Sequence, residues 1–202
     1  MTTGNPQDPT QPMFRLDNPD ANLKNPYRTR VPPTPRPPGN VPYVVDNLWE
    51  WARPEGYPSR RQCVCASPTL ALAQQYGGTA AGRVYEVRQL VGARVAQLEL
   101  PDAKLHADAR SLHKTLLQLL GGSSFLTGTW AARQALAPLW MPCLTRYEVD
   151  ALFATAPALA AIKTPLIGQI GFWRDVRLVS LSSPWPFPQG EIFFEAQTWY
   201  LV

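Results

Sequence analysis

Strand-like and helix-like segments alternate irregularly along this chain of 202 residues, and their order restricts the folds it can adopt. Alternating apolar and polar residues, and runs rich in β-branched and aromatic residues, predict strands. These lie at 27–31, 61–66, 83–88, 94–100, 166–174, 176–181 and 191–202. A doubly wound parallel sheet needs a regular strand–helix–strand alternation, which is missing here. We therefore expect an α+β fold.

Capping residues predict where the helices begin and end. Ser67 is placed as the N-cap of a helix over 69–76, with Pro68 at its first position and glycines after it. Thr145 and Glu148 have the spacing of a capping box. The other predicted helices lie at 102–120, 129–139 and 157–163. Both Gly-Gly pairs follow helices, whereas a phosphate-binding glycine loop precedes one.

Composition divides the chain into three parts. Residues 1–25 are rich in Asn, Asp, Pro, Thr and Gln, and we expect a disordered N-terminal arm there. Residues 32–42 are proline-rich and favour an extended polyproline segment. The composition from 42 onward is that of a folded domain. We therefore expect a single folded domain over 26–202 that includes the proline-rich segment.

Charge and cysteine content exclude several classes of protein. The net charge of +4 is mildly basic, which suits a phosphate-bearing ligand but is not a nucleic-acid signature by itself. Three cysteines and two histidines argue against a disulfide framework and against a metal site. The first fifty residues contain no apolar run, so no signal peptide is expected. No stretch of the chain approaches the roughly 20 apolar residues that a membrane span needs, so none is expected either.

Three short motifs follow one another in an order that has chemical meaning. Arg28 follows Tyr27 in the first predicted strand, Ser67 lies between a strand and a helix, and Glu191 stands at the start of the last strand within Gln189-Gly190-Glu191. This order resembles the R-S-E branch of the ADP-ribosyltransferase superfamily, which includes bacterial toxins and effectors. The stretch SPTLALAQQYG followed by RVYEV resembles the family segment after the serine. The sequence departs from the family's Ser-Thr-Ser by reading Ala66-Ser67-Pro68-Thr69.

The resemblance implies a fold, a substrate and a set of roles. The fold would be a split β-sandwich in which two small sheets with flanking helices surround an NAD cleft. Glu191 would stabilise the positive charge that develops on the ribose when nicotinamide leaves. Arg28 would make forked hydrogen bonds to the pyrophosphate or ribose, and Ser67 would fix one of these groups. Gln189, two residues before Glu191, would steer the acceptor.

The same resemblance indicates cofactor contacts and partners. Tyr76, Tyr85, Trp49 and Phe194 are candidates to stack on the nicotinamide of NAD. Arg28 and Ser67 would bind NAD as well. The ADP-ribose acceptor would be a target protein or a nucleic acid, and an immunity protein would be a further partner. Such an effector would be cytoplasmic in the producing cell and secreted without a signal peptide into a target cell.

Several alternatives stay open at this stage. Arg30 competes with Arg28, Glu195 competes with Glu191, and NAD hydrolysis competes with transfer. A protein-binding adaptor would use the proline-rich arm and the tryptophans of WEWARPEGYP as interface anchors. A cysteine hydrolase would pair Cys143 or Cys65 with His106 or His113. A nucleic-acid binder would use a stripe formed by Arg53, Arg60, Arg61, Arg83 and Arg88.

Overall fold

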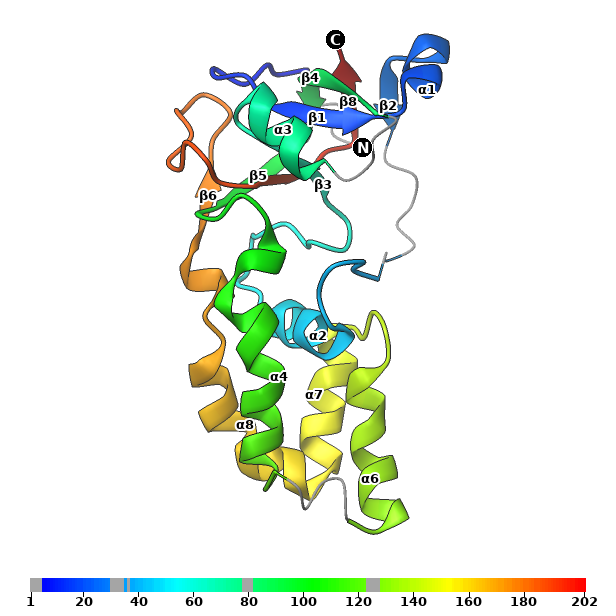
Figure 1. Cartoon of the computed structure of the whole chain (residues 1–202), viewed down its shortest axis with the longest axis vertical. Coiled ribbons are helices and arrows are strands. Elements are labelled where there is room, and N and C mark those ends of the chain that lie inside the picture. The colour runs from blue at the N-terminus through cyan, green and yellow to red at the C-terminus, as the bar shows by residue number, and fades with distance from the viewer. Residues whose placement is uncertain (1–4, 30–34, 36, 78–81, 123–127) are drawn as a thin grey trace. The chain divides into compact units, whose positions relative to one another are not determined.

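A computed structural model describes residues 5–29, 35, 37–77, 82–122 and 128–202 of the chain. They form two compact units, where the sequence predicted a single domain over 26–202 (Figure 1). The sheet unit comprises Met1–Thr34, Glu55–Ala103 and Asp175–Val202. The helical unit comprises Pro35–Pro54 and Lys104–Arg174. Each unit is therefore assembled from segments that are distant in sequence.

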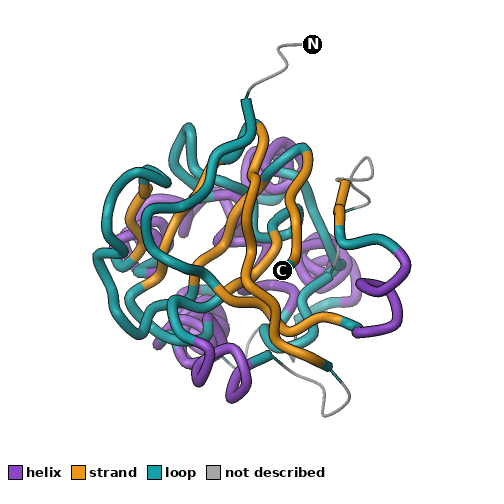
Figure 2. The backbone as a smooth tube through the Cα atoms, turned by 90° about the horizontal axis from the view of Figure 1, so that it is seen from above, coloured by secondary structure: helices purple, strands orange, loops and turns teal. Residues whose placement is uncertain are grey.

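The sheet unit contains two small antiparallel sheets, and together with the helices they confirm the predicted α+β class. One has the strand order β1-β4-β8-β2 and the other β3-β7-β5-β6, and the strands are orange in Figure 2. The strands are β1 Phe14–Asp17, β2 Tyr27–Thr29, β3 Val64–Ala66, β4 Arg83–Val91, β5 Arg94–Leu98, β6 Val176–Val179, β7 Ile192–Glu195 and β8 Thr198–Leu201. Two short helices, α1 Pro19–Lys24 and α3 Leu70–Tyr76, belong to the same unit.

One apolar cluster unites the two sheets. Val87 and Leu201 contribute to it from the first sheet, and Ile192 and Phe194 from the second. Ile192 and Phe194 lie two positions apart on β7 and therefore on one face, since side chains in a strand alternate with period two. Met13, which directly precedes β1, is fully buried in the same cluster. The two sheets therefore share a single core.

The N-terminal arm is ordered over its described part, so the prediction of disorder for residues 1–25 is wrong for 5–25. This stretch contains β1 and α1, and Gln7 forms an antiparallel bridge with Leu90. The arm has few apolar residues, but burial of Met13 and backbone pairing with β4 stabilise it. Composition alone does not register such backbone pairing, because the hydrogen bonds do not depend on side-chain type.

The last predicted strand, 191–202, is in fact two strands that belong to different sheets. β7 pairs with β3 and β5, whereas β8 pairs with β4 and β2. Between them the N–H of Gln197 donates to the carbonyl oxygen of Val91 at 2.8 Å. The chain thus crosses from one sheet to the other within two residues.

The helical unit is held by buried polar side chains as well as apolar ones. Its elements are α2 Tyr43–Trp51, η1 Ala103–Leu105 at its border, α4 Ala107–Leu119, α6 Trp130–Leu136, η2 Ala137–Trp140, α7 Arg146–Thr155, α8 Pro157–Gln169 and η3 Phe172–Arg174. Asp108 Oδ2 accepts hydrogen bonds from the Trp49 indole at 2.9 Å and from the N–H groups of Gly171 and Phe172 at 2.9 and 3.0 Å. These bonds join α2, α4 and the segment after α8.

The predicted strand over 166–174 is helical instead. α8 runs on through Pro165 to Gln169, and η3 follows it. Leu159, Ile162 and Leu166 are all buried, so the apolar side chains keep helical spacing past the proline. Packing of this face outweighs the unfavourable effect of an internal proline.

Candidate functional site

A cavity of about 130 Å³ lies where the two sheets of the sheet unit meet. Phe14 and Ser67 form an antiparallel bridge there, with N–H···O distances of 2.8 and 2.7 Å, which links β1 to the end of β3. The lining residues are Phe14, Arg15, Leu16, Cys65, Ala66, Ser67, Ala73, Tyr76, Gly77, Pro101, Asp102 and Glu191. The cavity is thus bordered by β1, β3, α3 and the residue that precedes β7.

Glu191 is the carboxylate that the sequence predicted, and it lines this cavity. Its backbone N–H donates to the carbonyl oxygen of Leu100 at 2.7 Å, which fixes the start of β7. Its Oε2 accepts a hydrogen bond from the N–H of Ala103 at 3.0 Å and lies 3.7 Å from Nη2 of Arg60. The side chain is 11% exposed. The negative charge is therefore held in a defined position at the cavity wall.

Ser67 also lines the cavity, but it does not cap the following helix. The N-cap of α3 is Thr69, whose hydroxyl accepts the N–H of Leu72 at 3.3 Å. Ser67 is buried, and its backbone is used in the bridge to Phe14. The predicted N-cap is therefore shifted by two residues, because pairing with the first strand extends as far as Ser67.

The arginine at the cavity is Arg15, not the predicted Arg28. Arg15 Nη1 donates to the carbonyl oxygen of Cys65 at 3.0 Å, so its guanidinium reaches from β1 to β3. Arg28 lies on β2 opposite Trp199, and it is not among the described residues that line the cavity. Its guanidinium contacts the carbonyl oxygen of Asn25, and its Nε lies 3.6 Å from Asp17. The competing Arg30 lies outside the described residues.

The other predicted site residues divide between the cavity and elsewhere. Tyr76, at the end of α3, lines the cavity. Tyr85 is buried in the shared core on β4, where the Arg83 guanidinium lies 5.8 Å from its ring centroid. Gln189 is exposed in a turn before β7 rather than on the strand with Glu191. The cavity therefore brings together Ser67, Tyr76 and Glu191 of the predicted set.

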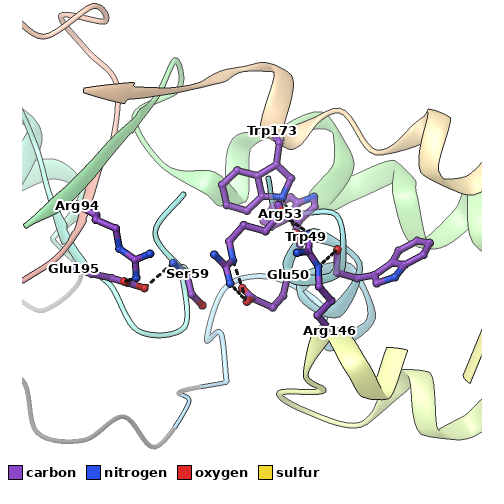
Figure 3. A network of polar contacts seen from close by, with 9 residues as sticks. Trp49, Glu50, Arg53, Ser59, Arg94, Arg146, Trp173 and Glu195 are labelled. Carbon is purple, nitrogen blue, oxygen red and sulfur yellow. Dashed lines mark hydrogen bonds and ion pairs between the residues drawn. The ribbon is translucent and has the colours of Figure 1, made fainter. Parts of the chain in front are cut away.

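Glu195, the alternative to Glu191, has a structural role. It is 3% exposed, forms an ion pair with Arg94, and accepts the N–H of Ser59 at 2.7 Å (Figure 3). These contacts fasten the segment around Ser59 to the strand pair β5–β7. A buried carboxylate with such partners is held by the fold and does not line the cavity.

Cys65 faces the same cavity as Glu191, and its chemistry is shaped by that neighbour. Packing around the Cys65 side chain, which still leaves part of the residue exposed, raises the pKa of its thiol to about 12, and the charge of Glu191 adds to this effect. Such a thiol is protonated near neutral pH and is a poor nucleophile. The ring nitrogens of the two histidines accept hydrogen bonds from the N–H of Asp108, for His106, and from the indole of Trp140, for His113. This arrangement gives no support to a hydrolase that uses Cys65.

The tryptophans proposed as adaptor anchors are core residues of the helical unit. Trp49 is 1% exposed and stacks on Phe172 with ring centroids 4.1 Å apart, and its carbonyl oxygen accepts the indole N–H of Trp173 (Figure 3). Trp51 is 5% exposed and stacks on Phe153. Side chains buried in this way are not available as interface anchors.

The arginines predicted to form a nucleic-acid-binding stripe do not form a row of exposed, unpaired guanidinium groups. Arg61 is buried, Arg53 pairs with Glu50, and Arg88 pairs with Glu86. Paired or buried guanidinium groups contribute little positive potential to a surface. The stripe therefore gives little support to nucleic-acid binding.

Arg15 and Asp102 are cavity residues that the sequence did not single out, whereas Cys65 was a candidate only as the nucleophile of a hydrolase. Phe14-Arg15 is an aromatic–arginine pair like Tyr27-Arg28, so the same motif search had a signal for it. The composition of residues 1–25 predicted disorder, and a disordered segment would not carry a site residue. Asp102 was interpreted as the start of a helix, and no local signal placed it near Glu191.

Comparisons with family models, with curated proteins and with solved structures gave no match for this chain. Among the helices of the described residues, none has the length and apolar character needed to cross a membrane.

Proposed function

We propose that this chain is a mono-ADP-ribosyltransferase of the bacterial effector or toxin type, which cleaves NAD and transfers ADP-ribose to a macromolecular target. The observation that supports the proposal most is the convergence of Arg15, Ser67 and Glu191 on one cavity between two small sheets. The R-S-E resemblance in the sequence implies such a convergence, and Arg15 replaces Arg28 in it.

The chemistry of the cavity wall suits the bond that is broken in NAD. Departure of nicotinamide leaves positive charge on the ribose, and a fixed carboxylate such as Glu191 lowers the energy of that state. The Arg15 guanidinium is suited to oxygen atoms of a phosphate or ribose, because it offers several donors in one plane. Tyr76 offers an aromatic ring to the departing nicotinamide.

The size of the cavity limits what it encloses. A volume of about 130 Å³ lies below the roughly 300–1,000 Å³ of pockets that enclose a drug-sized ligand. It has room for one part of the dinucleotide, and the reacting nicotinamide and ribose are the part that needs Glu191. The adenosine half would then lie outside the cavity.

The acceptor, the partners and the location are part of the same proposal. A target protein or nucleic acid would approach the exposed Gln189 beside the cavity-lining Glu191. A neutralising immunity protein would protect the producing cell, and the chain would be secreted into a target cell without a signal peptide.

The test compares wild type with Glu191→Gln and with Glu99→Gln as a matched control. Glu99 is an exposed glutamate of the same unit and does not line the cavity. The full chain is incubated with labelled NAD and a cell lysate, and both free nicotinamide and labelled macromolecules are measured. We expect Glu191→Gln to lower kcat by at least about a hundredfold, as for loss of one transition-state group.

The same change should leave the fold and the binding of NAD nearly intact. Glutamine keeps the size of the side chain and an oxygen that accepts the N–H of Ala103, so we expect less than about 1 kcal/mol of lost stability. Glu99→Gln should behave as wild type. Normal turnover by Glu191→Gln, or a wild type that releases no nicotinamide with any lysate, would refute the proposal.

A further inference from the structure

A single buried glutamine holds the turn that precedes Glu191. Gln97, on β5, is fully buried between β6 and β7 in the second sheet. Its Nε2 donates to the carbonyl oxygens of Phe187 at 2.6 Å and Gly190 at 3.1 Å, and its Oε1 accepts the N–H of Phe187 at 3.0 Å. All three hydrogen bonds of this amide go to the two ends of one turn of four residues.

The turn itself is closed and tightly seated. The N–H of Gly190 donates to the carbonyl oxygen of Phe187 at 3.0 Å, and Pro186 and Pro188 flank Phe187 and restrict its backbone. A Cβ on Gly190 would collide with the carbonyl oxygen of Leu98 and lie 2.8 Å from Cβ of Phe187. Only glycine therefore lets the turn lie this close to β5.

The fixed turn leads directly into the catalytic candidate. Glu191 follows Gly190, and its backbone continues the same register, since its carbonyl oxygen accepts the N–H of Leu98 at 2.9 Å. Gln189 at the corner of the turn is exposed, so the clamp holds the base of the turn and leaves the corner facing outward. A buried amide can satisfy its hydrogen-bonding groups with partners from several elements. The amide of Gln97 instead makes all three of its hydrogen bonds to this one turn.

We propose that Gln97 is a positioning residue, which clamps the 187–190 turn and thereby fixes Glu191 at the cavity wall. This inference rests on the proposed function. Gln97 touches neither substrate nor reacting atoms in this role; it acts through the turn. Preorganisation of this kind matters because a charge displaced by about 1 Å loses much of its effect on the transition state.

The test uses Gln97→Met, which keeps the length of the side chain and removes all three hydrogen bonds. The matched control is Val95→Ala, a core truncation on the same strand whose side chain belongs to the apolar cluster. In hydrogen exchange, the N–H groups of Phe187 and Gly190 should exchange at least about fivefold faster in Gln97→Met, as expected for loss of hydrogen bonds that hold a local structure. In Val95→Ala, the exchange rates of these two N–H groups relative to those of the rest of the unit should be the same as in wild type.

The kinetic arm separates positioning from stability. Gln97→Met should lower kcat for nicotinamide release by about tenfold or more with little change in KM for NAD, because Glu191 acts mainly in the transition state. Val95→Ala, at comparable thermal stability, should keep kcat. An equal loss of kcat in both variants, or a turn that exchanges no faster in Gln97→Met, would overturn the proposal.

A second variant covers the case in which Gln97→Met does not fold. Pro188→Gly loosens the exposed corner of the turn without touching the buried strand, and it should change exchange and kcat in the same direction by a smaller factor. Unchanged exchange and kcat in Pro188→Gly would then count against the proposal. The hydrogen-exchange measurement needs no turnover, so it decides whether Gln97 clamps the turn even if the wild type is inactive. An inactive wild type would refute the proposed function, and with it the catalytic role of the clamp.

Discussion

Buried polar side chains serve different ends in the two units. In the helical unit, Asp108 receives three donors, and Asn47 bonds to the backbone of Leu139, Met141 and Leu144. Each of these groups lies inside the unit and connects its elements. In the sheet unit, the Glu191 carboxylate accepts the N–H of Ala103 and Ser67 is buried, but both residues border a cavity.

The difference teaches how burial should be interpreted in a protein of this kind. A buried carboxylate surrounded by donors indicates structure when its partners come from several packed elements, as with Asp108 and Glu195. It is a candidate for a site when a cavity lies beside it and polar or aromatic side chains share the wall, as Arg15 and Tyr76 do with Glu191. Burial alone does not separate the two cases.

The largest expected effect is on the stability of the helical unit. Asp108→Ala leaves the indole of Trp49 and two backbone N–H groups without their acceptor, and we expect a loss of about 3 kcal/mol or more in unfolding free energy. Urea denaturation followed by far-ultraviolet circular dichroism measures this.

Asp150→Ala is the matched control, because Asp150 also accepts an indole N–H, from Trp51, but is 47% exposed. We expect it to lose less than about 1 kcal/mol. NAD turnover per folded molecule should be unchanged in both variants. If Asp108→Ala abolished turnover while the protein stayed folded, the division between structural and cavity-lining carboxylates would be wrong.

The second effect tests which arginine belongs to the site. Arg15→Lys removes the planar fork at the cavity, and kcat/KM for NAD should fall by at least about tenfold. Arg28→Lys keeps a cation near Asp17 away from the cavity, and it should change kcat/KM by less than about threefold. Steady-state nicotinamide release measures both. A larger loss of kcat/KM in Arg28→Lys than in Arg15→Lys would show that Arg28, the arginine predicted from the sequence, is the one that acts on NAD.

A third effect reports the charge of Glu191 without any turnover. The pKa of the Cys65 thiol is raised, so alkylation at pH 8 should be slow although the residue is exposed. Glu191→Gln removes a negative charge that disfavours the thiolate, which lowers the pKa and should speed alkylation by about threefold to tenfold, since one pKa unit is tenfold in thiolate. Mass spectrometry of the modified peptides gives the rates.

Cys143, which lies in the helical unit, is the internal control for this experiment. Its alkylation rate should be the same in wild type and Glu191→Gln. An unchanged rate at Cys65 would mean that the carboxylate does not act on the thiol across the cavity wall.

The smallest effect concerns an exposed pair of the helical unit. Asp150 has a lowered pKa, first because the Trp51 indole donates to it and then because Lys163 lies 3.1 Å away. Its contribution to stability is present above the pKa of the unfolded chain and is lost as pH falls through the folded pKa. Lys163→Met should cost less than about 0.5 kcal/mol at neutral pH and reduce the loss of stability between pH 5 and about 3. Urea midpoints across this range measure it.

The sequence predicted secondary structure correctly where residues close together in the chain determine it. The capping box of Thr145 and Glu148 is confirmed at the start of α7, and α8 begins at the predicted Pro157. These features depend on residues a few positions apart. The α+β class followed likewise from the order of the segments.

Features that depend on distant partners were missed. β1 has four residues in a polar segment, and it is a strand because β4 pairs with it. The split of 192–201 into two strands depends on which sheets lie nearby, since both halves have strong strand composition. Arg15 was lost with β1, whereas Glu191 and Ser67 were found because their motifs are adjacent in sequence to the elements that place them.

The order of segments along the chain also sets the order of assembly during synthesis. Every segment of the helical unit has been translated once Arg174 is made, whereas β7 and β8 come later. β7 lies between β3 and β5, and β8 lies between β4 and β2, so neither sheet can close before they emerge. At roughly 5–20 residues per second this delay lasts a few seconds, during which the helices can form while the cavity still lacks Glu191. The carboxylate of Glu191 therefore reaches the cavity wall only when β7 takes its place between β3 and β5.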